Sequence, residues 1–308
     1  MPLPRDCRAL LDEVSAHNAR ALGRAITLAE EGGDRAGELL CALEELPLPE
    51  AATIGLTGTG GAGKSTLAAR LIDHFRASSR RVGLIAVDPS SPLSGGAVLG
   101  DRVRMMRHAC DTHVTIRSMA SRGRLGGLSA ATASAARLMK LFGCDPVIVE
   151  TVGVGQAEFD IVRLADLTAL VLAPGLGDDI QAMKAGLIEM ADLLVINKGD
   201  LPGAEALRRD LDPIARDRGR ALLQVSARDG TGIDALTTTL DALFCQASQS
   251  GALADKRKRA SDAETLDWAL ELLRESLEPI VAAQDEASRQ KDPRVRAQKA
   301  IQNYFDAL

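Results

Sequence analysis

The stretch from Gly58 to Thr66, Gly-Thr-Gly-Gly-Ala-Gly-Lys-Ser-Thr, limits the possible folds of this chain more than any other feature. A short apolar run at 53–56 precedes it, and residues 67–72 continue with apolar side chains at helical spacing. A strand, a glycine-rich turn and a helix in that order are typical of a phosphate-binding loop, whose backbone N–H groups and helix dipole face the phosphates. We expect the loop to bind a nucleotide through Gly58, Gly60, Gly61, Ala62, Gly63, Lys64, Ser65 and Thr66.

The chain around this loop predicts an α/β fold, a P-loop nucleotide-binding domain with a mostly parallel sheet covered by helices on both faces. From residue 52 to about 246, apolar strands alternate with amphipathic helices. The expected strands are 53–56, 82–87, 114–116, 147–149, 167–172, 193–196 and 222–225. The expected helices are 65–78, 128–142, 179–190, 203–218 and 232–246. Ligands bind beyond the carboxyl ends of such strands, so the residues that follow each strand are the candidate site.

Helical segments flank this domain, which we place at residues 51–247. Residues 1–50 are expected to form an N-terminal helical hairpin, broken at Gly32-Gly33, and residues 248–308 a C-terminal helical arm. The arm opens with the basic run 256–259, which we interpret as a solvated face or an interface rim.

Side chains for catalysis and metal binding are expected at the phosphate end. Lys64 would reach the outer phosphates, and the Ser65 hydroxyl would bind Mg²⁺. Asp88, Asp101 and Glu150 follow strands or lie in the loop after one, and carboxylates bind Mg²⁺ directly or through water. These residues predict a magnesium and phosphate site.

The expected chemistry is phosphoryl transfer by positioning and charge stabilisation, without a covalent intermediate. Asp88 is the candidate for orienting the attacking water or a metal-bound water. Arg104 is a candidate for neutralising charge in the transition state when its loop folds inward.

Asn197-Lys198-Gly199-Asp200 follows the sixth strand and predicts guanine as the base. The Asp200 carboxylate can accept hydrogen bonds from both N1–H and the exocyclic amine of guanine, and adenine offers no such pair. We expect Asn197 to tie this loop to the phosphate loop, and the stem of Lys198 to lie along the base. Backbone N–H groups around Ser226-Ala227 would meet the guanine carbonyl oxygen. The sequence therefore favours GTP and GDP over adenine nucleotides.

Two further loops are expected to report the phosphate state by changing their order. The first contains Gly153 and Gln156, directly after Glu150. The second follows the fifth strand and contains Gly177 and Asp178, with Lys184 on the helix that the loop caps.

Composition and charge argue against several other classes of protein. Aromatic residues make up 2% of the chain and the net charge is −5, which disfavours a nucleic-acid binder. We find no apolar run of membrane-spanning length and no apolar core of a signal peptide, so we expect no membrane partner and a cytoplasmic location. The five cysteines are scattered, and His108, Cys110 and His113 fit no strong zinc pattern.

Taken together, these motifs resemble the MeaB/ArgK family of GTPases. The resemblance covers most of the chain and is most specific at residues 87–91 and 149–156, with further matches at 22–30, 58–66 and 197–200. It implies a homodimeric G-protein chaperone that gates adenosylcobalamin delivery to a coenzyme B12-dependent acyl-CoA mutase and protects or reactivates that enzyme. It also implies that Lys64, Ser65, Asp88, Asp101 and Glu150 form the Mg²⁺ and phosphate site, and that the arm mediates dimerisation.

The sequence departs from the family pattern at residues 117–124 and 181–185. These departures leave open which acyl-CoA mutase the chaperone would serve. A mutase for methylmalonyl-CoA, isobutyryl-CoA or 2-hydroxyisobutyryl-CoA is compatible with these residues.

Two alternative functions would use the same phosphate loop. A metal-delivery GTPase of the nickel-chaperone type would bind metal, with His108, Cys110 and His113 as the candidate ligands. A small-molecule kinase would leave Asn197–Asp200 without a purpose.

Overall fold

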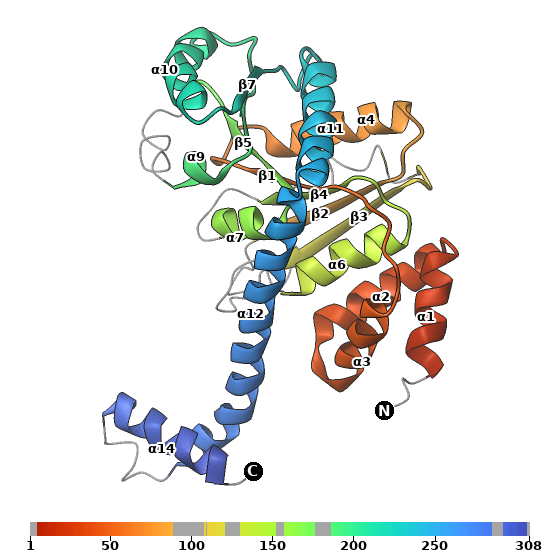
Figure 1. The fold of residues 1–308 in the computed structure, drawn as a ribbon, viewed down its shortest axis with the longest axis vertical. Coiled ribbons are helices and arrows are strands. Elements are labelled where there is room, and N and C mark those ends of the chain that lie inside the picture. The colour runs from red at the N-terminus through yellow and green to blue at the C-terminus, as the bar shows by residue number, and fades with distance from the viewer. Residues whose placement is uncertain are drawn as a thin grey trace. The chain divides into compact units, whose positions relative to one another are not determined.

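The computed structural model describes residues 5–88, 108, 110–120, 130–151, 157–175, 186–284 and 292–306. Within these ranges a seven-stranded sheet forms in the order β3-β2-β4-β1-β5-β6-β7, and every pair of neighbouring strands is parallel (Figure 1). The strands are β1 Thr53–Thr57, β2 Val82–Asp88, β3 Val114–Ala120, β4 Val147–Thr151, β5 Leu167–Leu172, β6 Leu193–Ile196 and β7 Ala221–Gln224. The predicted α/β fold is confirmed.

The strand order places β1 at the centre of the sheet, between β4 and β5. The chain builds outward on both sides of β1, which makes the carboxyl end of this strand the point where the direction of winding changes. Ligands of open parallel sheets bind at such a point. The glycine-rich loop leaves β1 there, directly before helix α4 (Lys64–Ala77).

Helices cover both faces of the sheet. On one face α4 packs beside α11 (Ile233–Gln249). The helices of the other face are α6 Ala130–Leu141, α7 Ala157–Leu164, α9 Leu187–Met190 and α10 Ala204–Asp217 (Figure 1).

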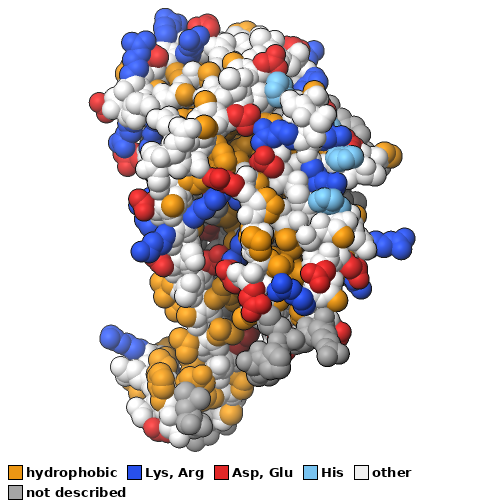
Figure 2. All heavy atoms as spheres, turned by 45° about the vertical axis from the view of Figure 1, so that its right-hand side comes forward, with side chains coloured by type: hydrophobic (Ala, Val, Ile, Leu, Met, Phe, Trp, Pro, Cys, Tyr) orange, Lys and Arg blue, Asp and Glu red, His pale blue; other side chains and the backbone are white. Residues whose placement is uncertain are grey.

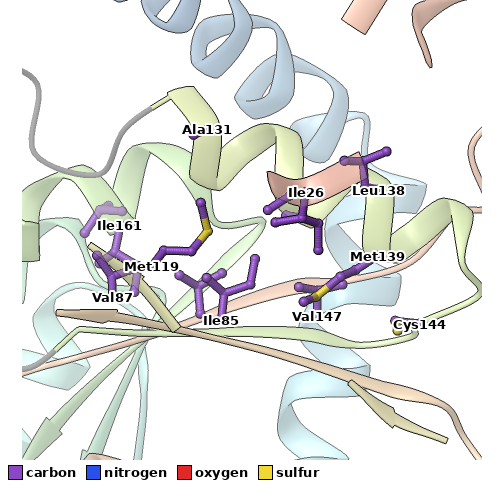
Figure 3. Close-up of a cluster of buried hydrophobic side chains, with 14 of the residues drawn as sticks. Ile26, Ile85, Val87, Met119, Ala131, Leu138, Met139, Cys144, Val147 and Ile161 are labelled. Atoms are coloured by element: carbon purple, nitrogen blue, oxygen red, sulfur yellow. The ribbon is translucent and has the colours of Figure 1, made fainter. Parts of the chain in front are cut away.

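Alternation along the strands creates a separate core on each face. In β2, Ile85 and Val87 belong to the core under α6 and α7, whereas Leu84 and Ala86 belong to the core under α4 and α11. Successive side chains of a strand point to opposite faces, so a strand buried on both sides is apolar throughout. Figure 3 shows side chains of the first core from the sheet, from α6 and from the N-terminal helices packed together.

The N-terminal segment differs from the expected hairpin because it contains three helices, α1 Arg5–Ser15, α2 Ala19–Glu31 and α3 Gly33–Glu44. The chain turns at His17, whose φ is +62°, and Asn18 then caps α2 by accepting hydrogen bonds from the N–H groups of Arg20 and Ala21. An asparagine before an apolar periodic segment is an N-cap signal. Helix α2 packs against α6, so these helices extend the core of the nucleotide domain.

Helix α7 was not among the expected helices. It connects β4 to β5 and has only eight residues, too few for helical periodicity to stand out. Gly55 of β1 makes room for it, since a Cβ at this position would lie 2.9 Å from Cγ1 of Ile161 and 3.0 Å from Cβ of Ala165. Close packing of α7 on β1 therefore requires glycine in the strand.

The chain forms two compact units, Met1–Arg257 and Lys258–Leu308. Helix α12 (Ala252–Ala282) begins in the first unit and continues into the second, which also contains α14 (Pro293–Asp306). Among the helices of the described ranges, none combines the length and the apolar character that crossing a membrane requires.

Two residues of the basic run 256–259 form specific ion pairs that the expectation of a solvated face or interface rim did not include. Arg257 donates to both carboxylate oxygens of Asp166, at 2.8 and 2.9 Å. Lys256 donates to Asp192 at 2.9 Å and to the carbonyl oxygen of Asp166 at 3.0 Å. The sequence pattern missed this role because the two acids lie far away in the chain. The start of α12 is thereby bound to the amino-terminal edge of the sheet.

Asp166 is buried, and its carboxylate also accepts from Lys140 Nζ at 3.1 Å and from the backbone N–H of Thr53 at 2.8 Å. The change Asp166→Asn leaves the buried Lys140 and the partly exposed Arg257 without their counter-charge, so the free energy of unfolding should fall by about 3 kcal/mol. Urea denaturation followed by circular dichroism measures this loss. The matched control is Asp212→Asn, which removes a partner from the exposed Arg216 pair and should change stability by at most about 0.5 kcal/mol. Equal losses in the two variants would contradict the account.

The same interaction fixes a pH dependence. Burial by itself raises the pKa of Asp166, but the hydrogen bond from Arg257 and the charges of Lys140 and Arg257 outweigh it, so the pKa of this carboxyl lies below its usual value. A depressed folded pKa contributes stability above the unfolded pKa of about 3.9 and loses it as the pH falls through the folded pKa. The stability difference between the wild type and Asp166→Asn should therefore narrow below about pH 4.

Candidate functional site

The glycine-rich loop wraps closely against its neighbours, and two glycines make this possible. At Gly58 φ is +134°, and a Cβ would lie 2.0 Å from the carbonyl oxygen of Val171 in β5. At Gly63 φ is +87°, and a Cβ would lie 2.5 Å from Nδ2 of Asn197. A side chain at either position would push the loop off the sheet, so the tight curvature that aims backbone N–H groups inward depends on glycine.

Lys64 lies inside this loop. The residue is 5% exposed, and its Nζ donates to the carbonyl oxygens of Gly58 at 2.6 Å and Thr59 at 3.0 Å. The Lys64 ammonium has three N–H donors, and the carbonyl oxygens that it contacts lie at the start of the loop. It is therefore placed where an anion enclosed by the loop would lie.

Ser65 and Glu150 meet at the carboxyl ends of the strands. Ser65 Oγ donates to Glu150 Oε1 at 2.5 Å, and Glu150 is buried at the end region of β4. Nearby hydroxyls of Thr57, Thr59 and Thr151 are also buried and have no hydrogen-bond partner among the described residues. Buried oxygen atoms are normally satisfied, and this set of hard oxygen donors fits Mg²⁺ with its retained waters.

Asn197 connects the phosphate loop to the end of β7. Its Nδ2 donates to the carbonyl oxygens of Ala62 at 2.9 Å and Gly63 at 3.3 Å, and its Oδ1 accepts from the backbone N–H of Ala227 at 3.0 Å. The side chain is almost fully buried, so these bonds are shielded from water. One amide thus sets the separation of two loops that follow different strands.

Asp200 is held in place by Ser226. The Ser226 hydroxyl lies 2.8 Å from Asp200 Oδ1 and 3.0 Å from Asp229 Oδ2. Hydrogen bonding from Ser226, followed by a backbone N–H, lowers the pKa of Asp200. The carboxylate is exposed and ionised, with acceptor capacity left for two parallel N–H groups of a ligand. Lys198, at φ +57°, makes the turn that brings Asp200 to Ser226.

Arg70 supports the same region, although no sequence motif indicates this role. From α4 it donates to the carbonyl oxygens of Ala227 at 2.8 Å and Arg228 at 2.6 Å. These contacts fix the carbonyl groups of Ala227 and Arg228, while the N–H of Ser226 donates to the carbonyl oxygen of Thr231 at 2.9 Å and the N–H of Ala227 donates to Oδ1 of Asn197. An isolated arginine on a helix carries no periodic or motif signature, so only the structure reveals this contact.

Asp88 is described only as the last residue of β2. Ala86 and Val87 pair with Glu150 and Thr151 of β4, so the end of β2 lies at the same edge of the sheet as Glu150. The other expected site residues outside the described ranges are Asp101, Arg104, Gly153, Gln156, Gly177, Asp178 and Lys184.

The weak metal motif is not assembled in the described part of the chain. His108 Nε2 lies 3.5 Å from Asp73 Oδ1, and His113 Nδ1 lies 3.7 Å from Asp111 Oδ1. Cys110 is exposed. Over the described residues, no three His, Cys, Asp or Glu side chains are grouped as metal ligands. Each histidine instead has its own acidic neighbour.

Comparison with known proteins identifies the family that this geometry belongs to. Residues 22–286 match the family described as "Methylmalonyl Co-A mutase-associated GTPase MeaB". The chain belongs to the MeaB family of GTPases. The resemblance seen in the sequence motifs is confirmed, and the chain is a GTPase.

Curated relatives agree with this family over most of the chain. A protein of Pyrococcus abyssi described as "Putative GTPase PYRAB02490" is 44% identical over 264 residues, which cover 83% of this chain and 81% of that protein. The mouse protein "Methylmalonic aciduria type A homolog, mitochondrial" is 36% identical, over 77% of this chain and 63% of its own length. The crystal structure of an LAO/AO transport system kinase has a TM-score of 0.68 and 24% identity, over 98% of this chain and 99% of that one, and supports the fold.

Proposed function

We propose that this MeaB-family GTPase is a chaperone of a coenzyme B12-dependent acyl-CoA mutase. It would use GTP binding and hydrolysis to gate adenosylcobalamin loading and to protect or reactivate the mutase. The observation that carries the proposal is the family match over residues 22–286, because the description of that family names a mutase. The name of the mouse relative, which refers to methylmalonic aciduria, points in the same direction.

The contacts described above support the proposed nucleotide site. Lys64 and the N–H groups of residues 58–66 hold the phosphates, and Lys64 exchanges its loop carbonyls for phosphate oxygens when GTP binds. Asp200 accepts both N–H groups of the guanine edge, while Ser226 and Asn197 keep Asp200 and the loop around Ala227 in place.

Ser65 and Glu150, together with Asp88 and Asp101, would hold Mg²⁺. The short Ser65–Glu150 contact supports this set because it joins a hydroxyl and a carboxylate at the phosphate end. The ion would neutralise charge that develops on the transferring phosphoryl group. Arg104 is proposed to add positive charge when its loop closes.

The signalling parts are proposed from the sequence motifs and from the exposed surface of the arm. Gly153 and Gln156 in one loop, and Gly177, Asp178 and Lys184 near another, would change order with the γ-phosphate. The arm would form a homodimer, since Figure 2 shows hydrophobic side chains gathered on it. The exposed large hydrophobic residues of the arm are Leu266, Leu270, Leu272, Leu273, Val281, Val295, Ile301 and Phe305.

Guanine recognition is tested by Asp200→Asn. The amide can accept from N1–H but presents a donor to the exocyclic amine, so GTP affinity should fall by about a hundredfold or more. Xanthosine triphosphate has a carbonyl where guanine has that amine and should bind the variant better than GTP does. Calorimetric titration with both nucleotides measures this exchange. The control Asp217→Asn makes the same change at an exposed position at the end of α10 and should keep GTP affinity within about threefold. Unchanged GTP binding by Asp200→Asn would remove the assignment.

Client identity is tested by capture. The chain is immobilised with GDP or with a non-hydrolysable GTP analogue and presented with mutases for methylmalonyl-CoA, isobutyryl-CoA and 2-hydroxyisobutyryl-CoA. One mutase should be retained, and its amount should differ between the two nucleotides because the switch loops differ. Asp200→Asn supplied with the same nucleotides is the control and should lose that difference. Retention of none of the three would contradict the chaperone proposal.

A further inference from the structure

Glu158 is a buried carboxylate that the site described so far does not use. It lies in the first turn of α7, is 3% exposed, and its Oε1 is buried without a hydrogen-bond partner among the described residues. Burying an unsatisfied carboxylate is unfavourable by several kcal/mol, roughly the cost of losing its hydration. A residue that contributes only to packing would be apolar here. The buried carboxylate therefore indicates that a ligand or a water molecule donates a hydrogen bond to it in the working protein.

Helix packing places Glu158 at the phosphate end of the sheet. Ile161 and Ala165 of the same helix contact β1 at Gly55. Residues three apart share a helix face, so Glu158 follows Ile161 on the face toward β1, displaced by about 4.5 Å along the axis. Because α7 begins after the carboxyl end of β4, this displacement runs toward the carboxyl end of β1, where the phosphate loop starts.

Electrostatics agree with that placement. Burial raises the pKa of Glu158, and the ammonium of Lys64 lowers it. The charge of Lys64 acts on Glu158 although the Lys64 ammonium itself binds the carbonyl oxygens of Gly58 and Thr59. The two side chains therefore share one buried region, which is the region that the outer phosphates of a bound nucleotide would enter. A carboxylate with spare acceptor capacity beside the phosphates is suited to hold water rather than phosphate, because two anions repel each other.

We propose that Glu158 is a catalytic residue of the GTPase, whose Oε1 accepts a hydrogen bond from the water that attacks the γ-phosphate. The water oxygen forms a bond to the γ-phosphorus while the bond from that phosphorus to the β–γ bridging oxygen breaks. The electron pair of the broken bond stays on GDP, and the proton lost by the water passes through Glu158 to solvent. This inference rests on the nucleotide site proposed above and takes the role of orienting water away from Asp88, leaving Asp88 with the metal.

The decisive variant is Glu158→Gln, which keeps the size of the side chain and removes its charge. Single-turnover hydrolysis of bound GTP should slow by about tenfold or more, since groups that orient or deprotonate a nucleophile contribute about 10²–10⁴-fold. The affinity for GDP and the Mg²⁺ concentration for half-maximal rate should stay within about twofold of the wild type. The melting temperature should stay equal or rise, because an unpaired buried charge is removed.

Control variants separate this role from a structural one. Asp160→Asn removes the same charge two residues along α7 and should keep the wild-type rate. Glu158→Asp keeps a carboxylate on a shorter side chain, so its hydrolysis rate should lie between those of the wild type and Glu158→Gln. If Glu158→Gln does not fold, the rate of Glu158→Asp tests the proposal in its place. Asp88→Asn should shift the Mg²⁺ dependence, which Glu158→Gln leaves alone.

Two results would overturn the proposal. One is a hydrolysis rate for Glu158→Gln within about twofold of the wild type. The other is a slower rate accompanied by an equally large loss of GDP affinity, or by a lower melting temperature. Such a result would mean that Glu158 contributes to nucleotide binding or to folding. A wrong assignment of the nucleotide site would give a different result from a wrong assignment of Glu158. In that case Lys64→Ala would bind GDP as tightly as the wild type does.

Discussion

The side-chain amide of Asn197 is the contact on which the arrangement of the site depends. It donates to carbonyl groups of the phosphate loop and accepts from the backbone of Ala227, so it joins segments that follow β1, β6 and β7. Because the amide is buried, each of these hydrogen bonds would leave an unsatisfied polar group if it were lost. Gly63 permits this contact, since a Cβ there would occupy the place of Asn197 Nδ2. Asn197 and, from α4, Arg70 thus hold the loop carrying Ser226 against the phosphate loop and the helix that follows it.

The opposite edge of the sheet is fixed by Asp166 in a similar way. This carboxylate binds the start of β1 through Thr53, α6 through Lys140 and the start of α12 through Arg257. It lies two residues after α7, whose first turn contains the buried Glu158. One short helix thus connects the phosphate end of the sheet to the residue that holds α12. The middle and end of this helix pack tightly on β1 at Gly55.

Much of the fold could be predicted from the sequence because its signals are local. The five inner strands are buried and largely apolar, and all seven strands overlap the segments predicted for them. The edge strand β3 continues to Ala120, beyond the predicted end at residue 116, because its polar residues hide the extension. The phosphate loop and the Asn197–Asp200 segment carry motifs whose spacing is dictated by the ligand. The position of Asn197 under the phosphate loop follows from that same chemistry.

What could not be predicted depends on contacts between distant parts of the chain. The buried Glu158 belongs to a helix too short for periodicity to reveal, and Arg70 contacts a loop that lies 157 residues further on. Lys256 and Arg257 have the composition of a solvated basic run, and only the folded chain shows that Asp166 and Asp192 neutralise them. The apolar positions between residues 10 and 29 predict one helix, whereas the left-handed His17 and the Asn18 cap divide this segment into α1 and α2.

The central claim is that this end of the sheet selects guanine through Asp200, positioned by Ser226 and Asn197. Calorimetric titration of the whole chain with GDP and with ADP, in the presence of Mg²⁺, tests it most directly. The account predicts that GDP binds at least about a hundredfold more tightly, because ADP leaves the Asp200 carboxylate without its two N–H partners. Equal affinity for the two nucleotides, or tighter binding of ADP, would contradict it.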